Sequence, residues 1–335
     1  MSSTDIPIPQ APSIPGLRFR VFAGESDYPA MAVVMNKLAE HEGVTAMWNA
    51  YTLTHMDQWI RNFDPPRDRV IVEIDGKMVG AGRVESGQES SGKRVYMHSC
   101  NLLPEWRGKG IERSMLLHNE ARLREIAATH PQDGPRFFQA FSLPQTNPEA
   151  IANVVAFGYE PIRHSYQMVR PDLENIPDAP LPAGITSRPM AEHEMRQIWD
   201  AGNEAFRDHW GHMDPPADGF ETWKNCEDLD RNLSRVAWEG DQVVGRVLIY
   251  IPSSHNERAA KKRADTESIC VGRPWRKRGV ATALIAQCLH ALRDAGFHEA
   301  ALGVDTENAS GALRIYERMG YKVVQKYSRY QKAMD

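Results

Sequence analysis

A basic, glycine-containing segment marks the point where a strand-like run gives way to a helix. Residues 267–271 (ESICV) form that run, Arg276 and Gly279 follow, and small and apolar residues then recur at helical spacing. The first N–H groups of a helix lack partners, and the positive end of its dipole lies there. The junction therefore predicts a site for an anion of diphosphate size, although similar turns also occur in proteins that bind none.

Two carboxylates lie on the strand that leads into this segment. Asp265 and Glu267 are two positions apart, so a regular strand presents both on one face. A carboxylate in that position can take a proton from a nucleophile, and the residues alone equally allow solvent-facing charge at a strand edge. The sequence does not decide which of the two would act as a base.

A second titratable cluster lies upstream, in FRDHWGHMDPP. Because histidine titrates near neutrality, this cluster can hold or deprotonate a polar acceptor. It can also be a loop packed by its tryptophan with solvated histidines, and it lacks the Cys/His spacing of a metal site. The candidate acceptor residues are Asp208, His209, Trp210 and His212.

The elements around these residues occur twice along the chain. The segment PEWRGKGIE (104–112) is repeated in similar form as RPWRKRGVA (273–281). The segment DGKMVG (75–80) likewise has a counterpart in EGDQVVG (239–245), and both of these predict a hairpin turn between two apolar runs. The proline-rich stretch 171–184 separates the copies and excludes helix interior and central strand. We therefore expect a flexible tail (1–16), a first domain (17–170), a linker (171–184) and a second domain (185–335) of mixed α/β class.

Composition narrows the classes of protein that fit. The chain has 335 residues, of which 41% are hydrophobic and 25% charged, which suits two globular domains. No apolar run reaches the roughly 18 residues of a membrane span, and the tail lacks the apolar core of a signal peptide, so we expect a cytoplasmic protein. The net charge of -4 gives no reason to expect nucleic-acid or membrane binding. Four scattered cysteines predict neither zinc nor disulfides.

Two segments resemble the GNAT acetyltransferases. Motif A of that family, Q/R-x-x-G-x-G/A, is matched by Arg276, Gly279 and Ala281. The family's closing segment, N-x7-Y-x3-G-F/Y, is matched in order and spacing by Asn308, Tyr316, Gly320 and Tyr321. The resemblance implies two tandem domains, each a mixed, mostly antiparallel sheet flanked by helices, with acetyl-CoA as the donor and no metal.

The resemblance also implies roles for single residues. The pyrophosphate of CoA would lie on the loop formed by Arg276, Lys277, Arg278, Gly279, Val280 and Ala281. The pantetheine arm would pair with the backbone of Ile269, Cys270 and Val271 as an added strand. Asn308 would orient a water or a pantetheine amide, or would only cap a helix.

Acetyl transfer to an amine also needs an acid for the leaving thiolate. The resemblance points to Tyr316 for this role, with a buried core tyrosine as the alternative. It implies that Asp265 or Glu267 is the base, which in this family sometimes acts through a water molecule. In many relatives the positioning of amine and thioester supplies most of the rate, so that no single base dominates.

The first copy departs from this pattern at three positions. Glu112 stands where a small residue is expected, Val154 stands opposite Tyr316, and His98 occupies the place of Glu267. We expect an inactive copy that braces the second one or shapes its acceptor cleft, although residues 108–110 leave acyl-CoA binding open.

The sequence therefore predicts an N-acetyltransferase that moves an acetyl group from acetyl-CoA to a primary amine of a small molecule by direct attack. The C-terminal domain would be the active one, in a monomer or homodimer. Protein or peptide N-termini are alternative acceptors. A non-catalytic acyl-CoA sensor is the alternative from another functional class.

Overall fold

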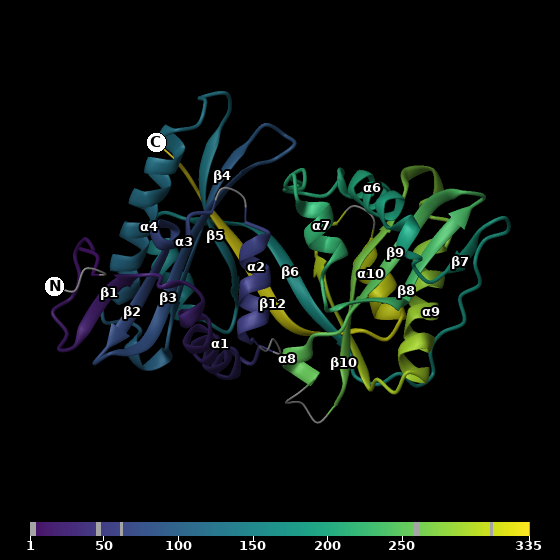
Figure 1. Ribbon diagram of the computed structural model, residues 1–335, viewed down its shortest axis with the longest axis horizontal. Coiled ribbons are helices and arrows are strands. Elements are labelled where there is room, and N and C mark those ends of the chain that lie inside the picture. Colours follow the sequence, from purple (N-terminus) through teal and green to yellow (C-terminus); the bar gives the residue numbers. More distant parts are fainter. Residues whose placement is uncertain (1–4, 45–47, 61–62, 257–260, 309–310, 335) are drawn as a thin grey trace. The chain divides into compact units, whose positions relative to one another are not determined.

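The chain folds into two compact units (Figure 1), seen in a computed structural model that describes residues 5–44, 48–60, 63–256, 261–308 and 311–334. The first unit comprises Met1–His164 together with Lys326–Asp335, and the second comprises Ser165–Gln325. Within the described residues, no helix is both long enough and apolar enough to cross a membrane.

The first unit holds a mixed sheet in the strand order β1-β2-β3-β4-β5-β12. Strands β4 and β5 pair in parallel, and the other neighbouring pairs are antiparallel. Its elements are β1 (Leu17–Val21), α1 (Tyr28–Glu42), α2 (Ala50–Gln58), α3 (Pro65–Asp68), β2 (Arg69–Ile74), β3 (Lys77–Gln88), β4 (Arg94–Leu102), α4 (Ile111–Ala128), β5 (Arg136–Pro144), α5 (Pro148–Ala156) and residues 326–333 of β12 (Lys322–Ala333).

The second unit repeats this arrangement in the strand order β6-β11-β10-β9-β8-β7. Here β10 and β11 are the parallel pair. Its elements are β6 (Glu160–Arg170, of which residues 165–170 lie in this unit), β7 (Thr186–Arg188), α6 (Met195–Phe206), α7 (Gly219–Lys224), β8 (Leu229–Glu239), β9 (Gln242–Tyr250), α8 (Ser253–Asn256), β10 (Arg263–Val271), α9 (Val280–Asp294), β11 (Glu299–Asp305), α10 (Ala312–Arg318) and residues 322–325 at the start of β12.

The boundary between the units cuts two strands. Tyr327–Ala333 of β12 pairs with β5 in the first unit, whereas Ser165–Arg170 of β6 pairs with β11 in the second. The compact units thus differ from the predicted domains 17–170 and 185–335 at both of these strands. The physical reason is that sheet pairing joins residues far apart in sequence, and no local pattern announces the partner.

The predicted hairpins and their turns are confirmed. Asp75 and Gly76 adopt φ values of 49° and 74°, the left-handed pair that a two-residue type I′ turn requires between β2 and β3. Strands β8 and β9 turn at Gly240 in the same place of the second unit. Residues 171–184 form neither helix nor strand.

Two helices sandwich the strands that carry the candidate site. Arg246 and Val247 are neighbours in β9, so their side chains leave opposite faces of the sheet. The Arg246 guanidinium donates to the carbonyl of Ile198 in α6, whereas Val247 lies in the hydrophobic core with Leu284 of α9. The sheet thus holds the start of α9 and the end of α6 at fixed places beside β10.

Candidate active site

The parallel pair β10–β11 opens part of the way along its length. The two strands pair only from Arg263↔Glu299 to Asp265↔Ala301. On the other side of β10, pairing with β9 is interrupted between Glu267 and Cys270, where Ser268 takes a φ of 52° in a β-bulge. The bulge turns β10 away from β11 and leaves the predicted pantetheine-binding backbone, Ile269–Val271, without pairing to β11.

The loop after β10 has the backbone conformation of an anion-binding turn. Lys277 and Gly279 both have positive φ, 62° and 91°, and α9 begins directly afterwards at Val280. Alternation of left- and right-handed residues turns successive N–H groups toward one concave side. The predicted anion loop therefore has suitable geometry in its backbone.

The start of α9 is open to a ligand. Gly279 is its N-cap and offers no side-chain oxygen to the first N–H groups, and the first turn contains no acidic residue. Lys277, Arg278 and Gly279 are exposed. The unpaired amides and the helix dipole thus face solvent at a place where an anion gains from both.

The Arg276 side chain is held by three hydrogen bonds within the protein. Its Nε donates to the carbonyl of Val271 at 3.0 Å, its Nη2 to the carbonyl of Ala205 at 3.0 Å, and its Nη1 to the carboxylate of Asp208 at 2.8 Å. Because all three nitrogens have protein partners, the guanidinium shapes the loop, whereas Lys277 and Arg278 are exposed to solvent.

Asp208, which the sequence predicts to contact the acceptor, braces the loop before α9 in the structure. Its carboxylate accepts from Nε and Nη2 of Arg273 as well as from Arg276. These hydrogen bonds, from Arg273 first and Arg276 second, hold the pKa of Asp208 well below its usual range. The end of α6 is thereby tied to the loop that precedes α9.

The two candidate bases have perturbed carboxyls. Desolvation of its carboxyl is the largest cause that raises the pKa of Glu267 to about 8, and the negative charge of Asp265 is the second. The side chain is nevertheless exposed, and contact with water opposes this shift. Burial likewise raises the pKa of Asp265 to about 6. The N–H of Gly303, on the β11 side of the opening, hydrogen-bonds the Glu267 carboxylate and partly offsets the shift.

Tyr316 is buried, with only 7% of its surface exposed, and lies within electrostatic range of Glu267. Burial raises its pKa, and the charge of Glu267 is the second cause. Its ring meets that of Tyr321 edge-on, with centroids 6.2 Å apart. The structure therefore brings together the predicted acid and the predicted base.

The remaining predicted residues have mixed surroundings. The ring of His209 packs edge-on against that of Phe206, with the two ring centroids 4.5 Å apart. Desolvation lowers the pKa of His209, and the charge of Asp305 opposes this shift. His212 is mostly buried and lies 3.6 Å from Asp214, and Trp210 is half-buried. Asn308 does not cap α10, because Gly311 is the N-cap of that helix.

Sequence reasoning missed the residue that supports the bulge. Arg246 is only 4% exposed, and its Nη2 donates to the hydroxyl of Ser268 at 2.9 Å. The signal was an arginine inside the apolar run of β9, where a buried charge needs a partner. Among the described residues, His, Cys, Asp and Glu side chains form no group of three or more suited to a metal ion.

The sequence profile of the acetyltransferase (GNAT) family matches residues 34–130 and 195–321, which together make up more than half of the chain. A mycothiol acetyltransferase of Salinispora arenicola is 27% identical over 286 residues, covering 80% of this chain and 82% of the relative. The enzyme of that name from Paenarthrobacter aurescens is also 27% identical, over 248 residues, covering 71% and 69%.

Solved structures share the fold across nearly the whole chain. A GCN5-related N-acetyltransferase from Sphaerobacter thermophilus superposes with a TM-score of 0.73 at 23% identity, covering 95% of both chains. A tandem GNAT protein from the clavulanic acid biosynthesis pathway gives a TM-score of 0.68 at 14% identity, covering 95% and 98%.

The family match falls on both repeats, and the second repeat carries the opened strand pair and the anion loop. GNAT acetyltransferases use acetyl-CoA as their acyl donor, and both features suit that donor. The chain is therefore an acyl-CoA-dependent acetyltransferase with two tandem GNAT domains, and it belongs to the acetyltransferase (GNAT) family.

Proposed function

We propose that the second unit transfers an acetyl group from acetyl-CoA to the primary amine of a small molecule by direct attack. The observation that carries the proposal is the electrostatic interaction between Glu267 and Tyr316, close to the opening between β10 and β11. The first unit, with Val154 in place of the tyrosine, would not catalyse the transfer.

Donor binding would use the backbone on both sides of the loop. The amides at 277–281 would hold the diphosphate, and Ile269–Val271 would pair with the amides of the pantetheine arm. This arrangement would direct the thioester toward Glu267, at the point where β10 and β11 part.

In the transfer, the amine nitrogen bonds to the acetyl carbon, the carbon–sulfur bond breaks, the nitrogen loses a proton and the sulfur gains one. Glu267 would accept the proton from the amine, directly or through a water. A pKa of about 8 makes it a stronger base than an ordinary carboxylate.

Tyr316 would deliver the proton to the sulfur. Burial and the charge of Glu267 keep its hydroxyl protonated at neutral pH. Once Glu267 has accepted a proton, its charge no longer raises the pKa of Tyr316, so the tyrosine becomes a better acid at the step that needs one. The two residues would therefore act as a coupled pair.

The test is release of free thiol from acetyl-CoA in the presence of a panel of amines. The panel should begin with the acceptor of the mycothiol acetyltransferases, because one of these relatives aligns with 80% of this chain. Tyr316→Phe should lower kcat at least tenfold, whereas Tyr330→Phe, at an equally buried tyrosine of the first unit, should leave it unchanged. Equal rates of thiol release in wild type and Tyr316→Phe would rule out Tyr316 as the acid.

Two outcomes would favour other functions. Activity on peptides with free N-termini, but not on small amines, would indicate a protein or peptide acetyltransferase. Tight acetyl-CoA binding without thiol release by any amine would indicate a sensor. We also propose a cytoplasmic location, because the expected donor and acceptors are found there.

A further inference from the structure

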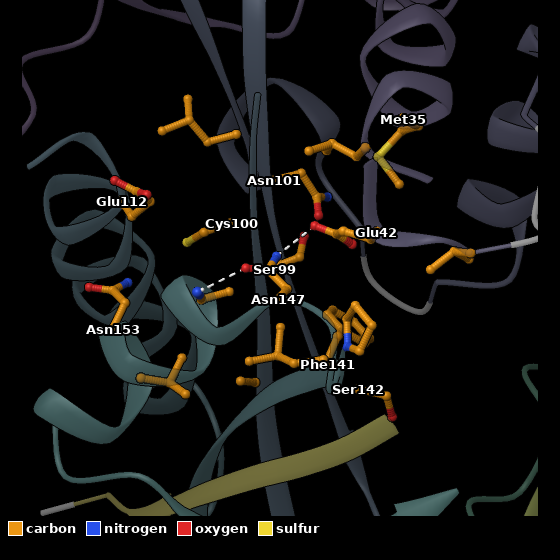
Figure 2. A pocket seen from close by; sticks show the side chains of 18 of the residues that line it. Met35, Glu42, Ser99, Cys100, Asn101, Glu112, Phe141, Ser142, Asn147 and Asn153 are labelled. Atoms are coloured by element: carbon orange, nitrogen blue, oxygen red, sulfur yellow. Dashed lines mark hydrogen bonds between the residues drawn. The ribbon is translucent and has the colours of Figure 1, made fainter. Parts of the chain in front are cut away.

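The parallel strands of the first unit separate in the same way as those of the second. Strands β4 and β5 pair only as far as His98↔Ala140. Beyond that point, residues 99–102 and 141–144 line opposite walls of a cavity of about 240 Å³. Figure 2 shows the interior of this cavity, and Glu112, in the first turn of α4, is one of the side chains that line it. The first unit therefore has an opening between its strands next to its own copy of the anion loop.

The two copies of the anion loop have the same backbone conformation. Gly108 and Gly110 have φ values of 69° and 90°, and the matching residues Lys277 and Gly279 have φ values of 62° and 91°. A helix begins directly after each loop, α4 in the first unit and α9 in the second. Both loops therefore direct their backbone N–H groups in the same way, as an anion-binding turn does.

Contacts within the protein hold the first loop in this conformation. Nε of Arg107 donates to the carbonyl of Leu102 at 3.0 Å, and Arg276 makes the corresponding hydrogen bond in the second unit. The hydroxyl of Ser114, one turn into α4, donates to the carbonyl of Gln10 at 2.8 Å. We therefore expect the loop to keep its shape when a side chain in the first turn of α4 is shortened.

The two copies differ in the group that occupies the loop. In the first unit, the Glu112 carboxylate accepts a hydrogen bond from the N–H of Gly108 at 3.1 Å. When the copies are aligned on their loop arginines, Glu112 corresponds to Ala281, whose methyl group offers no acceptor. A carboxylate oxygen of the protein thus takes the place on this amide where a phosphate oxygen would bind.

The charge of the two loops differs as well. After the loop arginine, residues 108–112 contain one lysine and one glutamate, so that their formal charges cancel. Residues 277–281 contain a lysine and an arginine, both exposed, and carry two positive charges. A diphosphate in the first loop would meet the negative charge of Glu112 at close range, and like charges repel there even near the protein surface.

We propose that Glu112 is an internal ligand of the first loop, an autoinhibitory contact that keeps acetyl-CoA out of the first unit. The chain would therefore bind one acetyl-CoA, in the second unit. This inference rests on the proposed binding of the donor by the loop before α9, but it does not depend on the residues that transfer the acetyl group.

The test counts the acetyl-CoA molecules that bind to the full-length protein, by isothermal titration calorimetry. Wild type should bind one per chain. Glu112→Ala, which gives the first loop the residue of the second, should bind two. A glutamate that only stabilised the start of α4 would, on removal, lower the thermal stability without adding a site. Two molecules bound by wild type, or one by Glu112→Ala, would overturn the proposal.

The control variant is Glu105→Ala. Glu105 is an exposed glutamate that precedes the loop, so this change removes the same charge without touching the contact at Gly108. It should bind one acetyl-CoA, like wild type. A second molecule bound by Glu105→Ala would show that net charge, and not the Glu112 contact, closes the first unit.

The reverse change moves the contact to the second unit. In Ala281→Glu, the new carboxylate can accept from the N–H of Lys277, because the backbones of the two loops are alike. This variant should bind acetyl-CoA at least tenfold more weakly than wild type. Adding Glu112→Ala to it should restore one bound molecule, now in the first unit, and cooperative thermal unfolding would show that each variant is folded. Unchanged affinity in Ala281→Glu alone would instead contradict donor binding by the loop before α9, and with it the function proposed above.

Discussion

Glu267 owes its proposed role to its surroundings. A glutamate with an ordinary pKa would be ionised and only weakly basic throughout the neutral range. Desolvation and the charge of Asp265 raise the pKa of Glu267 to about 8. The same strand gives the neighbouring Asp265 a pKa of about 6. The two carboxyls of this strand therefore titrate as a coupled pair, because the charge of Asp265 raises the pKa of Glu267.

We predict that kcat rises with pH and levels off above about 8. The raised pKa means that the carboxylate needed as a base is depleted below 8 and complete above it. Glu267→Gln should lower kcat and remove this ascending limb, as measured by a pH profile at saturating amine. An unchanged profile in Glu267→Gln would assign the limb to the amine itself.

Gly279 shows how backbone conformation alone can set binding. Its φ is 91°, and a Cβ at this position would meet no atom within 4 Å, so the cost of a side chain there is purely conformational. We predict that Gly279→Ala costs about 1–2 kcal/mol of unfolding free energy and raises KM for acetyl-CoA. Thermal unfolding and steady-state kinetics would measure both effects.

The matched control lies just beyond the other end of the same helix. Gly296 follows α9 with a φ of 80° and equally open surroundings. Gly296→Ala should lose similar stability while KM stays unchanged. Equal KM values in the two variants would mean that the loop does not hold the donor.

At the scale of elements, the loop before α9 depends on the end of α6. We predict that Asp208→Asn raises KM for acetyl-CoA a few-fold with little change in kcat, because Arg276 and Arg273 lose the carboxylate that orients them. Asp200→Asn, at an exposed pair with Arg196 on the same helix, is the control and should change neither value. A fall in kcat alone would instead place Asp208 at the acceptor.

Sequence reasoning recovered the elements better than their junctions. The hairpins, β10 and the start of α9 follow from local signals, namely a Gly-containing turn, an apolar run and a small-residue helix start. The bulge at Ser268 and the ties of Arg276 could not be predicted in this way, because they depend on partners such as Arg246 and Asp208 that lie 22 and 68 positions away. The packing of α6 against the loop before α9 therefore decides which positively charged side chains of that loop are accessible to a ligand.

At the scale of the molecule, the end of β12 belongs to the sheet of the first unit, although the residues before it belong to the second unit. We predict that Tyr330→Ala, near the C-terminus, destabilises the first unit, because this residue of β12 is 7% exposed and lies in the core with Phe138 and Tyr159. The expected loss is about 3–5 kcal/mol. Hydrogen exchange should show faster exchange in β4 and β5 and unchanged exchange in β8 and β9.

The converse substitution provides the control. Tyr321 is 2% exposed in the core of the second unit, so Tyr321→Ala should give the opposite pattern. Equal loss of protection in both units from either substitution would show that they unfold together, as a single cooperative block.

The exchanged strands also set an order of events during synthesis. Residues up to His164 emerge first, but their sheet lacks the strand that pairs with β5 until Lys326–Asp335 has been translated. At about 5–20 residues per second, the ribosome needs about 10–30 s to make the intervening segment. During that interval the backbone groups at the outer edge of β5 are unpaired and can pair with a strand of another chain. A nascent chain of this protein therefore depends on β12 to cover this edge.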